Sequence, residues 1–335
     1  MTNWKSGMDR KSWIANTNPE VTSMMIRKRK IPQVLSGNVL IVGLGLMGGS
    51  IVRSLKEYSE DIHIQAVDIR PEPIERALRD EMIEEGAVEP EEPEKTEALL
   101  GNSRLVVLSM YPTGMMRFLV EHAKTLRPGT IVMDICGLKG AFVEEAQRLM
   151  PEGVEFIGAH PMAGREKVGY ENGDGEMFLG ATFVLTPTER NTPETVSAMY
   201  DLARVLGFGR VREVDPMKQD GLIPYPSHLP HVMASVLMQA WHGGDDVKAF
   251  SGGSFRDVTR IADINENLWT ELFMMNSQAL TESLRDFMIT LGEFTSLMEA
   301  EDREGLKRFL KKSGDRKREW NREISRSELG GAHGK

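Results

Sequence analysis

The sequence predicts an α/β fold class, in which a mostly parallel sheet covered by helices on both faces is followed by an all-helical domain. Three observations support this prediction. Short apolar strands alternate with helical stretches over the first two thirds of the chain, a glycine turn joins the first strand to the first helix, and strand patterns end after Asp215. Continuous apolar strands that alternate with helices are typical of parallel sheets buried on both sides.

The first domain is expected to open with a strand, a glycine turn and a helix in "NVLIVGLGLMGGSIVRSLKEY", which starts at Asn38. A second strand at 62–68 precedes a helix from Pro71, and the acidic, proline-marked segment 86–101 is interpreted as a loop. Further strands are predicted at 105–110, 130–135, 155–159, 181–187 and 210–215, and further helices at 113–126, 139–149 and 193–206.

Domain boundaries follow from these patterns: an arm at 1–36, the α/β domain at 37–215 and a helical domain at 216–335. The helical periodicity is expected to break at "IPYPSHLP" and at "HGGDD". The segment "WTELFMMNSQALTESLRDFMITL" carries more apolar surface than one short bundle buries, so we expect a homodimer through this domain. Packing of the same residues on the first domain is the alternative.

Composition excludes several classes of protein. The 335 residues contain 41 Lys and Arg against 50 Asp and Glu, a net charge of −9, so a nucleic-acid partner is not expected. The sequence has no apolar run long enough to cross a membrane and no apolar signal segment at its N-terminus. The single cysteine, Cys136, can form no internal disulfide and agrees with a reducing compartment, so we expect a cytoplasmic protein.

Three glycines lie between the first predicted strand and the first predicted helix. Gly43, Gly45 and Gly48 form the pattern G-x-G-x-x-G. The first permits a tight turn, the second lets a pyrophosphate approach the backbone, and the third lets helix and strand pack closely. The N–H groups at the helix N-terminus then face the phosphates. The pattern predicts a Rossmann-type dinucleotide-binding domain, and a glycine turn without a ligand is the alternative.

The nucleotide is expected to be NAD. Asp68 ends the second predicted strand, 20 residues after Gly48, where a carboxylate accepts hydrogen bonds from ribose hydroxyls and repels a 2′-phosphate. Arg70 could instead pair with that phosphate, so NADP stays open as the less favoured cofactor. The predicted cofactor-binding residues are Gly43, Gly45, Leu46, Met47, Gly48, Asp68 and Ser109.

Four blocks of sequence, in this order, resemble a known family. They are "GLGLMGGS", "GAHPMAGREKVGY" with "MFLGATFVLTPT", "SHLPHVMA", and "FRDVTRIA" with "LW". Across residues 37–300 the chain is similar to the prephenate dehydrogenases, a family that includes arogenate dehydrogenases. The resemblance implies NAD-dependent conversion of prephenate to 4-hydroxyphenylpyruvate and carbon dioxide, on the route to tyrosine.

His160, in "GAHPMAGRE", is the predicted catalytic residue. In the implied reaction, hydride leaves the ring carbon that bears the hydroxyl while the hydroxyl loses its proton. An imidazole, with an ordinary pKa of about 6.5, is mostly neutral near pH 7 and can accept that proton. Pro161 fixes its own φ and restrains how the imidazole is presented. A buried histidine that serves only the structure is the alternative.

The resemblance also implies substrate-binding residues, some of them from the helical domain. Arg260 matches the family's substrate-binding arginine, since a guanidinium suits bidentate recognition of a carboxylate, and a surface ion pair is the alternative. No metal site is expected, because the H-x-x-H spacing in "SHLPH" has no acidic or cysteine cluster beside it. The other predicted substrate-binding residues are Ser227, His228, Glu166 and Gly137.

Three sites depart from the family pattern: position 137, position 219 and "INE" at 264–266, which replaces the usual "SDP". Gly137, in "DICGLK", stands where many members have a serine that would hydrogen-bond the histidine and the substrate. A bond of about 0.5–1.5 kcal/mol is therefore missing, or a water or the Cys136 thiol replaces it. Gln219 stands where histidine is frequent, and we expect this change to leave the geometry of the reacting groups untouched.

Three other functions stay open at this point. Arogenate differs from prephenate only by an amino group in place of the keto oxygen, so an arogenate dehydrogenase is the nearest alternative. A β-hydroxyacid dehydrogenase would use a lysine on a helix, and a non-catalytic NAD-binding regulatory module is conceivable because of Gly137. The short segments before residue 37 and after residue 300 predict a monofunctional enzyme.

Overall fold

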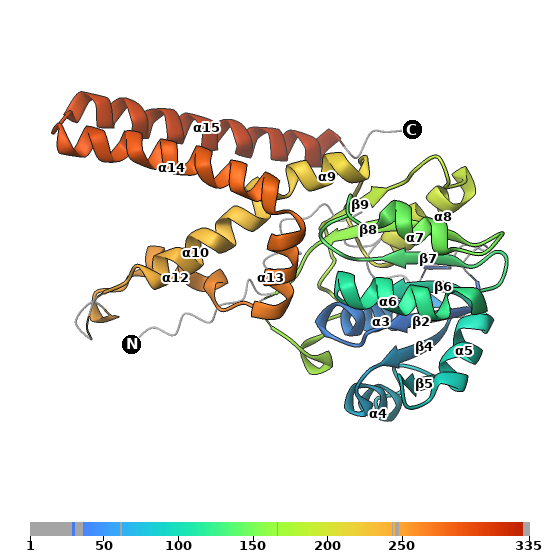
Figure 1. Cartoon of the computed structure of the whole chain (residues 1–335). Helices are drawn as coiled ribbons and strands as arrows, with labels where there is room; N and C mark the ends of the chain where they lie inside the picture. The colour runs from blue at the N-terminus through green and yellow to red at the C-terminus, as the bar shows by residue number, and fades with distance from the viewer. Residues whose placement is uncertain are drawn as a thin grey trace. The chain divides into compact units, whose positions relative to one another are not determined.

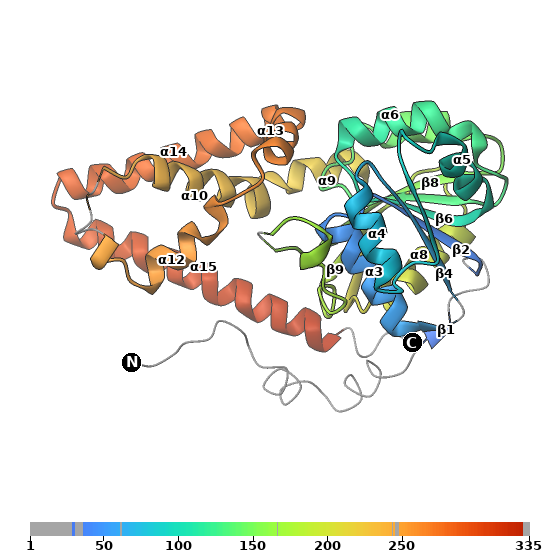
Figure 2. The same ribbon diagram turned by 90° about the horizontal axis from the view of Figure 1, so that it is seen from below.

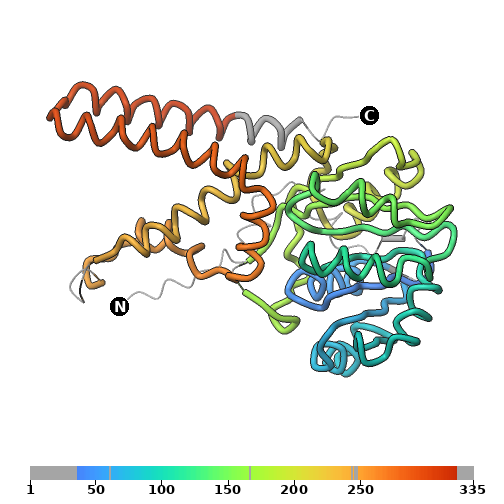
Figure 3. The backbone as a smooth tube through the Cα atoms, viewed as in Figure 1, coloured from blue at the N-terminus to red at the C-terminus, as the bar shows by residue number. Residues whose placement is uncertain are grey.

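The computed structural model describes residues 29–30, 36–60, 62–165, 167–242, 244 and 248–330. Most of the predicted arm at 1–36 therefore lies outside the described residues. The chain divides into two compact units, one up to Gln219 and the other from Asp220 (Figures 1 and 3). No helix among the described residues is long and apolar enough to cross a membrane.

The first unit is built on an eight-stranded sheet with the order β10-β9-β8-β7-β6-β2-β4-β5. Its six strands from β5 to β8 are parallel, in the order typical of a dinucleotide-binding Rossmann fold, while β9 runs antiparallel to β8 and parallel to β10. The fold class predicted from the sequence is confirmed. The strands are β2 (Asn38–Val42), β4 (His63–Asp68), β5 (Glu85–Val88), β6 (Ser103–Leu108), β7 (Ile131–Asp134), β8 (Glu155–Met162), β9 (Thr182–Thr186) and β10 (Arg210–Glu213).

Helices cover both faces of this sheet. Figure 2 shows α3 and α8 on one face and α5 and α6 on the other. Proline occupies the first turn of α4, α5, α6 and α8, where its missing N–H costs no helical hydrogen bond. The elements are α3 (Leu46–Tyr58), α4 (Pro71–Arg79), α5 (Pro93–Asn102), α6 (Pro112–His122), η2 (Ala123–Thr125), α7 (Val143–Leu149), η3 (Tyr170–Asn172) and α8 (Pro193–Val205), with a small pair of strands, β1 (Arg29–Lys30) and β3 (Ser59–Glu60), beside them.

The interpretation of 86–101 as a loop is wrong. This segment holds most of strand β5 and of helix α5, which begins at Pro93. The strand has a glycine at position 86, where a side chain would come within 2.8 Å of Ile74 in α4. The helix buries Leu99 and Leu100. Four glutamates between 89 and 94 hid this weak apolar pattern, since acidic and proline-rich composition is also typical of loops.

Several other elements differ from their predicted bounds by a few residues, and two of these differences have a clear structural cause. The helix predicted at 139–149 begins only at Val143, because Lys139 is fully buried and its ammonium is bonded to Asp134 and to the carbonyl of Cys136. The strand predicted at 155–159 continues to Met162, because its last residues pair with β9. Both differences come from long-range contacts that no local periodicity reports.

All the regular elements described in the second unit are helical. The break expected at "IPYPSHLP" is a π-helical turn, in which the N–H of Leu229 reaches the carbonyl of Pro224, in a segment where three prolines lack a donor. Helices α14 and α15 form an antiparallel hairpin with Phe294 packed against Phe309 (Figure 1). The elements are α9 (Pro216–Leu222), which crosses the unit boundary, η4 (Pro224–His228), α10 (Leu229–Gln239), α12 (Gly253–Thr259), η5 (Arg260–Ala262), α13 (Glu266–Met275), α14 (Ser277–Glu299) and α15 (Arg303–Gly330).

Candidate active site

The glycine turn after β2 leaves open space at the N-terminus of α3. Gly43 has φ +97°, and a side chain there would meet the carbonyl oxygen of Ser109 at 2.3 Å. A side chain at Gly48 would meet the carbonyl oxygen of Gly43 at 2.0 Å, whereas one at Gly45 would meet nothing within 4 Å. Gly43 and Gly48 are therefore required because a side chain at either position would clash with the backbone. Gly45 borders open space that a ligand can occupy.

The first N–H groups of α3 border this room. The helix starts at Leu46, and Met47 follows it in the first turn, so neither N–H has a carbonyl of its own helix to bind. Ser109 follows β6, where its N–H donates to the carbonyl of Val42 at the end of β2. Its side-chain oxygen lies against Gly48. Predicted cofactor-binding residues from two neighbouring strands thus meet at one edge of the sheet.

Asp68 connects this turn to the end of β4. Its carboxylate is 7% exposed and accepts hydrogen bonds from the N–H of Leu44, at 2.7 Å, and from the N–H of Arg70, at 2.9 Å. The guanidinium Nε of Arg70 lies 3.8 Å from the same carboxylate. Asp68 therefore holds the glycine turn in place, and because a carboxylate offers about four acceptor positions, it can accept further bonds from sugar hydroxyls.

His160 lies near the end of β8, at the carboxyl edge shared by β2, β6 and β7. It pairs with Val184 of β9, two residues beyond the point where β8 stops pairing with β7 at Asp134. The imidazole is half-buried. A side chain at Gly137 would contact its Cε1 and Nε2 atoms at 3.7 Å each. Gly137 and His160, both predicted from the sequence, are therefore neighbours.

The chain beyond His160 returns to the helix that follows the glycine turn. Tyr170 is 1% exposed and packs so closely on Gly49 of α3 that a side chain at that glycine would come within 3.0 Å of its ring. The N–H of Asp174 donates to the hydroxyl of Ser50, also in α3. These contacts fix the segment after "HPMAG" on the predicted nucleotide helix. Glu166, within this segment, lies outside the described residues.

Sequence reasoning missed a residue that contacts His160. Gln219, at the C-terminal end of the first unit, is 2% exposed. Its Nε2 donates to the carbonyl of Gly137 at 3.0 Å and lies 3.3 Å from Nδ1 of His160. From the sequence we expected the change at position 219 to leave the reacting groups untouched, and this contact between Gln219 and His160 was not predicted. Its only signal in the sequence was the departure from the family pattern.

A buried ion pair holds the loop that carries Gly137. Asp134 and Lys139 are both 0% exposed, with the ammonium 2.5 Å from the carboxylate. The N–H of Cys136 donates to the same carboxylate, and Lys139 also donates to the carbonyl of Cys136. Burial raises the pKa of Asp134, and the charge of Lys139 opposes that shift. The spacing D-x-x-x-x-K in "DICGLK" is compatible with this buried pair. It is equally compatible with a lysine on the surface, so the sequence alone did not predict the pair.

In the second unit, Ser227 and His228 belong to the π-helical turn η4. His228 is 1% exposed and makes edge contacts with the rings of Trp269 and Phe273. Burial, together with the nearby His231, lowers the pKa of His228 to about 4. His228, which was predicted to bind substrate, is thus a neutral imidazole in an aromatic cluster. Among the described residues, no group of His, Cys, Asp and Glu side chains is arranged to hold a metal ion.

Arg260 is exposed at the start of η5, which packs against α10 within the same unit. The neighbouring residue, Ile261, accepts a hydrogen bond at its carbonyl from Nδ1 of His231, at 3.0 Å. His231 also packs against Trp269, with ring centroids 3.8 Å apart and the ring planes tilted by 42°. The second unit therefore brings Arg260 close to the histidines of "SHLPH", although these residues are about 30 positions apart in the sequence.

Acid should destabilise the protein through His228. The folded state keeps this ring neutral down to about pH 4, whereas the unfolded chain takes a proton near pH 6.5, so the free energy of unfolding falls as the pH drops through that window. We expect His228 to account for about 2 kcal/mol lost between pH 7 and pH 5. Urea unfolding at both pH values should show a smaller loss for His228→Gln than for the natural chain. Equal losses would contradict the prediction.

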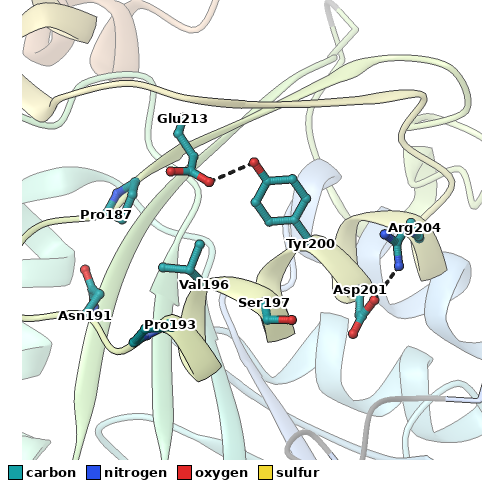
Figure 4. Close-up of a pocket in the computed structure, with 9 residues that line it drawn as sticks. All are labelled: Pro187, Asn191, Pro193, Val196, Ser197, Tyr200, Asp201, Arg204 and Glu213. Carbon is teal, nitrogen blue, oxygen red and sulfur yellow. Dashed lines mark hydrogen bonds and ion pairs between the residues drawn. The ribbon is translucent and has the colours of Figure 1, made fainter. Parts of the chain in front are cut away.

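A shallow hollow on the first unit lies away from all of these residues. It is lined by Pro187 at the end of β9, by residues of α8 and by Glu213 of β10 (Figure 4). Its polar groups bond to one another: Tyr200 donates to Glu213 at 2.8 Å, and Arg204 donates to Asp201 at 2.6 Å. The hollow contains no predicted site residue, and nothing about it points to a ligand.

Comparisons with known proteins agree with the geometry. The family model "Prephenate dehydrogenase, nucleotide-binding domain" matches residues 51–210, and "Prephenate dehydrogenase, dimerization domain" matches residues 215–312. A prephenate dehydrogenase of Bacillus subtilis (strain 168) is 27% identical over 289 residues, which cover 84% of this chain and 75% of the relative.

Two solved structures are similar in fold and sequence. The prephenate dehydrogenase from A. aeolicus, in complex with hydroxyphenyl propionate and NAD+, superimposes with a TM-score of 0.77 at 28% identity, covering 84% of this chain and 98% of that one. An arogenate dehydrogenase from Synechocystis gives a TM-score of 0.68 at 27% identity, covering 84% and 99%. Enzymes named for either substrate are thus similar to this chain.

Proposed function

Because this chain belongs to the prephenate dehydrogenase family, we propose that it oxidises prephenate with NAD and releases carbon dioxide and 4-hydroxyphenylpyruvate. The single observation that carries the proposal is the placement of His160. Its imidazole stands at the carboxyl edge of the sheet, on the edge that also bears the glycine turn, with Gly137 beside it. Ligands of open α/β sheets bind along this edge.

The residues around the glycine turn fit a dinucleotide. The open position at Gly45 and the first N–H groups of α3 would hold the pyrophosphate, with Leu46 and Met47 in that turn and Ser109 beside it. Asp68 would accept bonds from the ribose hydroxyls, and its negative charge disfavours the 2′-phosphate of NADP. NAD, when bound, supplies the acceptor for the hydride.

His160 acts on the ring hydroxyl of the substrate. As the carbon that bears this hydroxyl loses hydride, positive charge develops on the oxygen, and the imidazole accepts the hydroxyl proton. Loss of the ring carboxylate as carbon dioxide then makes the ring aromatic, and the proton returns to the phenol oxygen. The reaction therefore moves one hydride to the cofactor and releases carbon dioxide, while the hydroxyl proton is retained in the product.

The substrate carries two carboxylates, which need cationic or donor groups. Arg260 is the candidate for one of them, because an exposed guanidinium can bind a carboxylate through two parallel hydrogen bonds. Ser227, His228 and Glu166 are further candidates for the substrate site. The neutral ring of His228 would contribute through its aromatic neighbours or as a hydrogen-bond partner, and not as a cation.

The second unit supports a homodimer as the functional form. Among the described residues of this unit, six apolar side chains are buried: Ile223, Pro224, Leu229, Ala234, Leu272 and Leu280. Many others are exposed, which is unusual for a helical unit that stands alone. The matching family model is that of a dimerization domain. The exposed apolar side chains include Val236, Leu237, Met238, Met274, Met288, Ile289, Leu291 and Met298.

The proposed function is tested by following NADH at 340 nm with purified protein. Prephenate and arogenate are each supplied with NAD and, separately, with NADP. We expect turnover of prephenate with NAD to exceed that of the other three combinations. Preference for arogenate would change the substrate and keep the reaction, whereas binding of NAD without turnover of either substrate would favour a non-catalytic regulatory module.

Restoring the family serine should be tolerated. In Gly137→Ser the added Cβ would lie 3.7 Å from the imidazole, an ordinary contact distance, and Gly137 has no positive φ that demands glycine. The new hydroxyl can bond the imidazole or the substrate, so we expect kcat/KM to stay equal or to rise by up to about tenfold. Steady-state kinetics with prephenate checks this, and a loss above tenfold would show that the glycine has a role of its own.

A further inference from the structure

The contacts of Gln219 define the orientation of its amide in the resting structure. A backbone carbonyl can only accept a hydrogen bond, so the atom 3.0 Å from the carbonyl oxygen of Gly137 must be the NH2 group of the amide. The same NH2 group lies 3.3 Å from Nδ1 of His160. Nδ1 must therefore accept, and a neutral imidazole that accepts at Nδ1 carries its proton on Nε2.

The other end of the amide is unsatisfied. Oε1 of Gln219 is buried and accepts no hydrogen bond from any residue that the structure describes. A buried carbonyl oxygen without a donor costs about 1–3 kcal/mol. The terminal torsion of glutamine is broad and roughly two-fold, so a half-turn brings Oε1 to the place of the NH2 group, beside Nδ1. That turn breaks the hydrogen bond to the carbonyl of Gly137. It lets Oε1 accept a hydrogen bond from Nδ1 of His160 when Nδ1 carries the proton.

The two orientations present different atoms to a substrate. Position 137, where the family serine would stand, faces the Nε2 edge of the ring. With the observed orientation Nε2 carries a proton and can only donate. With the turned orientation Nδ1 carries it, and Nε2 offers the lone pair that a base needs.

From this geometry we infer that Gln219 is a positioning residue, whose amide sets which ring nitrogen of His160 carries the proton. The resting protein holds the proton on Nε2. When the amide turns, the Nε2 proton leaves to water and Nδ1 takes up a proton from water, so the ring stays neutral and Nε2 has the lone pair that accepts the hydroxyl proton of the substrate. The inference deepens the proposed function and rests on it, because the identity of the proton-bearing nitrogen matters only if His160 is the base. It also links two of the departures from the family pattern, because the amide of Gln219 is bonded to the carbonyl of Gly137.

The tautomer is measured directly by long-range 1H–15N correlation NMR on protein with labelled histidine, without substrate. The His160 signals are those that disappear in His160→Asn. We expect the neutral ring of the natural protein to carry its proton on Nε2. In Gln219→Glu the carboxylate can only accept, so the proton should move to Nδ1. A proton on Nδ1 in the natural protein, or an unchanged tautomer in Gln219→Glu, would overturn the inference.

Kinetics supply the second readout. Gln219→Met removes both the donor and the acceptor, and we expect kcat to fall roughly 10- to 100-fold with little change in KM. Gln219→Glu should retain more kcat than Gln219→Met, because it still holds the ring. The matched control is Gln147→Met, which removes another buried amide bonded to β8 through the carbonyl of Phe156. An equal loss of kcat in this control would reduce Gln219 to a structural role.

The proposed function and this inference fail separately. If the natural protein turns over neither substrate while the tautomer behaves as expected, the function is wrong and the positioning by Gln219 stands. If turnover is observed and the tautomer does not follow the residue at 219, the function stands and the inference is wrong. Thermal unfolding of each variant shows whether a loss of kcat reflects a loss of folded protein.

Discussion

Replacing His160 with asparagine should lower kcat by about 10²- to 10⁴-fold, the range usual for loss of a general base. Asparagine keeps a polar side chain at the end of β8 but has no group that accepts a proton near pH 7. Because the lost interaction is made mainly in the transition state, KM should change little. Steady-state kinetics with prephenate and NAD measures both constants.

The matched control for this change is His63→Asn. His63 is exposed at the start of β4, so the same substitution there should leave kcat within about twofold, as expected for a surface position. Binding of NAD, followed by fluorescence titration, should persist in both variants, because His160 is not among the residues at the glycine turn. A loss of kcat below tenfold in His160→Asn would remove the imidazole from the reaction.

Replacing Lys139 with methionine should cost about 3–5 kcal/mol of folding free energy at pH 7. The change leaves the carboxylate of Asp134 fully buried without its cation, whereas the length of the side chain is roughly kept. Urea unfolding, followed by circular dichroism, measures the loss. The loss should be smaller near pH 4, because burial raises the pKa of Asp134 and a protonated carboxyl group needs no cation.

Two further variants separate the buried charge from the packing. In Asp134→Asn combined with Lys139→Met no charge is left buried, so the double variant should be more stable than Lys139→Met alone. Lys56→Met breaks an ion pair with Glu84 whose side chains are more than a third exposed, and it should cost less than about 1 kcal/mol. Equal costs for Lys139→Met and Lys56→Met would mean that the buried pair contributes no more than a surface pair.

The ion pair and His160 are linked through one loop. Asp134 ends β7, and its carboxylate, together with Lys139, fixes the backbone of Cys136 immediately before Gly137. The carbonyl of Gly137 in turn holds the amide that contacts His160. A protein that loses the pair should therefore lose activity as well as stability, since the position of the imidazole depends on this loop.

Much of the first unit could be predicted because its signals are local. Apolar runs of strand length predicted each strand from β6 to β10 at nearly its observed place, and the glycine pattern predicted the turn between β2 and α3. Strand β5 and helix α5 escaped prediction because their apolar residues are few and stand among glutamates and prolines. In such a segment the composition indicates a loop while the apolar residues indicate a strand and a helix. Packing against the neighbouring strand then determines which structure forms.

By itself the sequence determined the parallel sheet, the glycine turn, the carboxylate that ends β4 and the histidine near the end of β8, because each depends on neighbouring residues and on the direction of a strand. Only the tertiary structure decided that Gln219 meets His160 across 59 positions and Gly137 across 82, and that Lys139 is buried rather than exposed. The physical reason is that burial and side-chain contact depend on which elements pack together, and a glutamine or a lysine has the same local pattern on a surface as in a site.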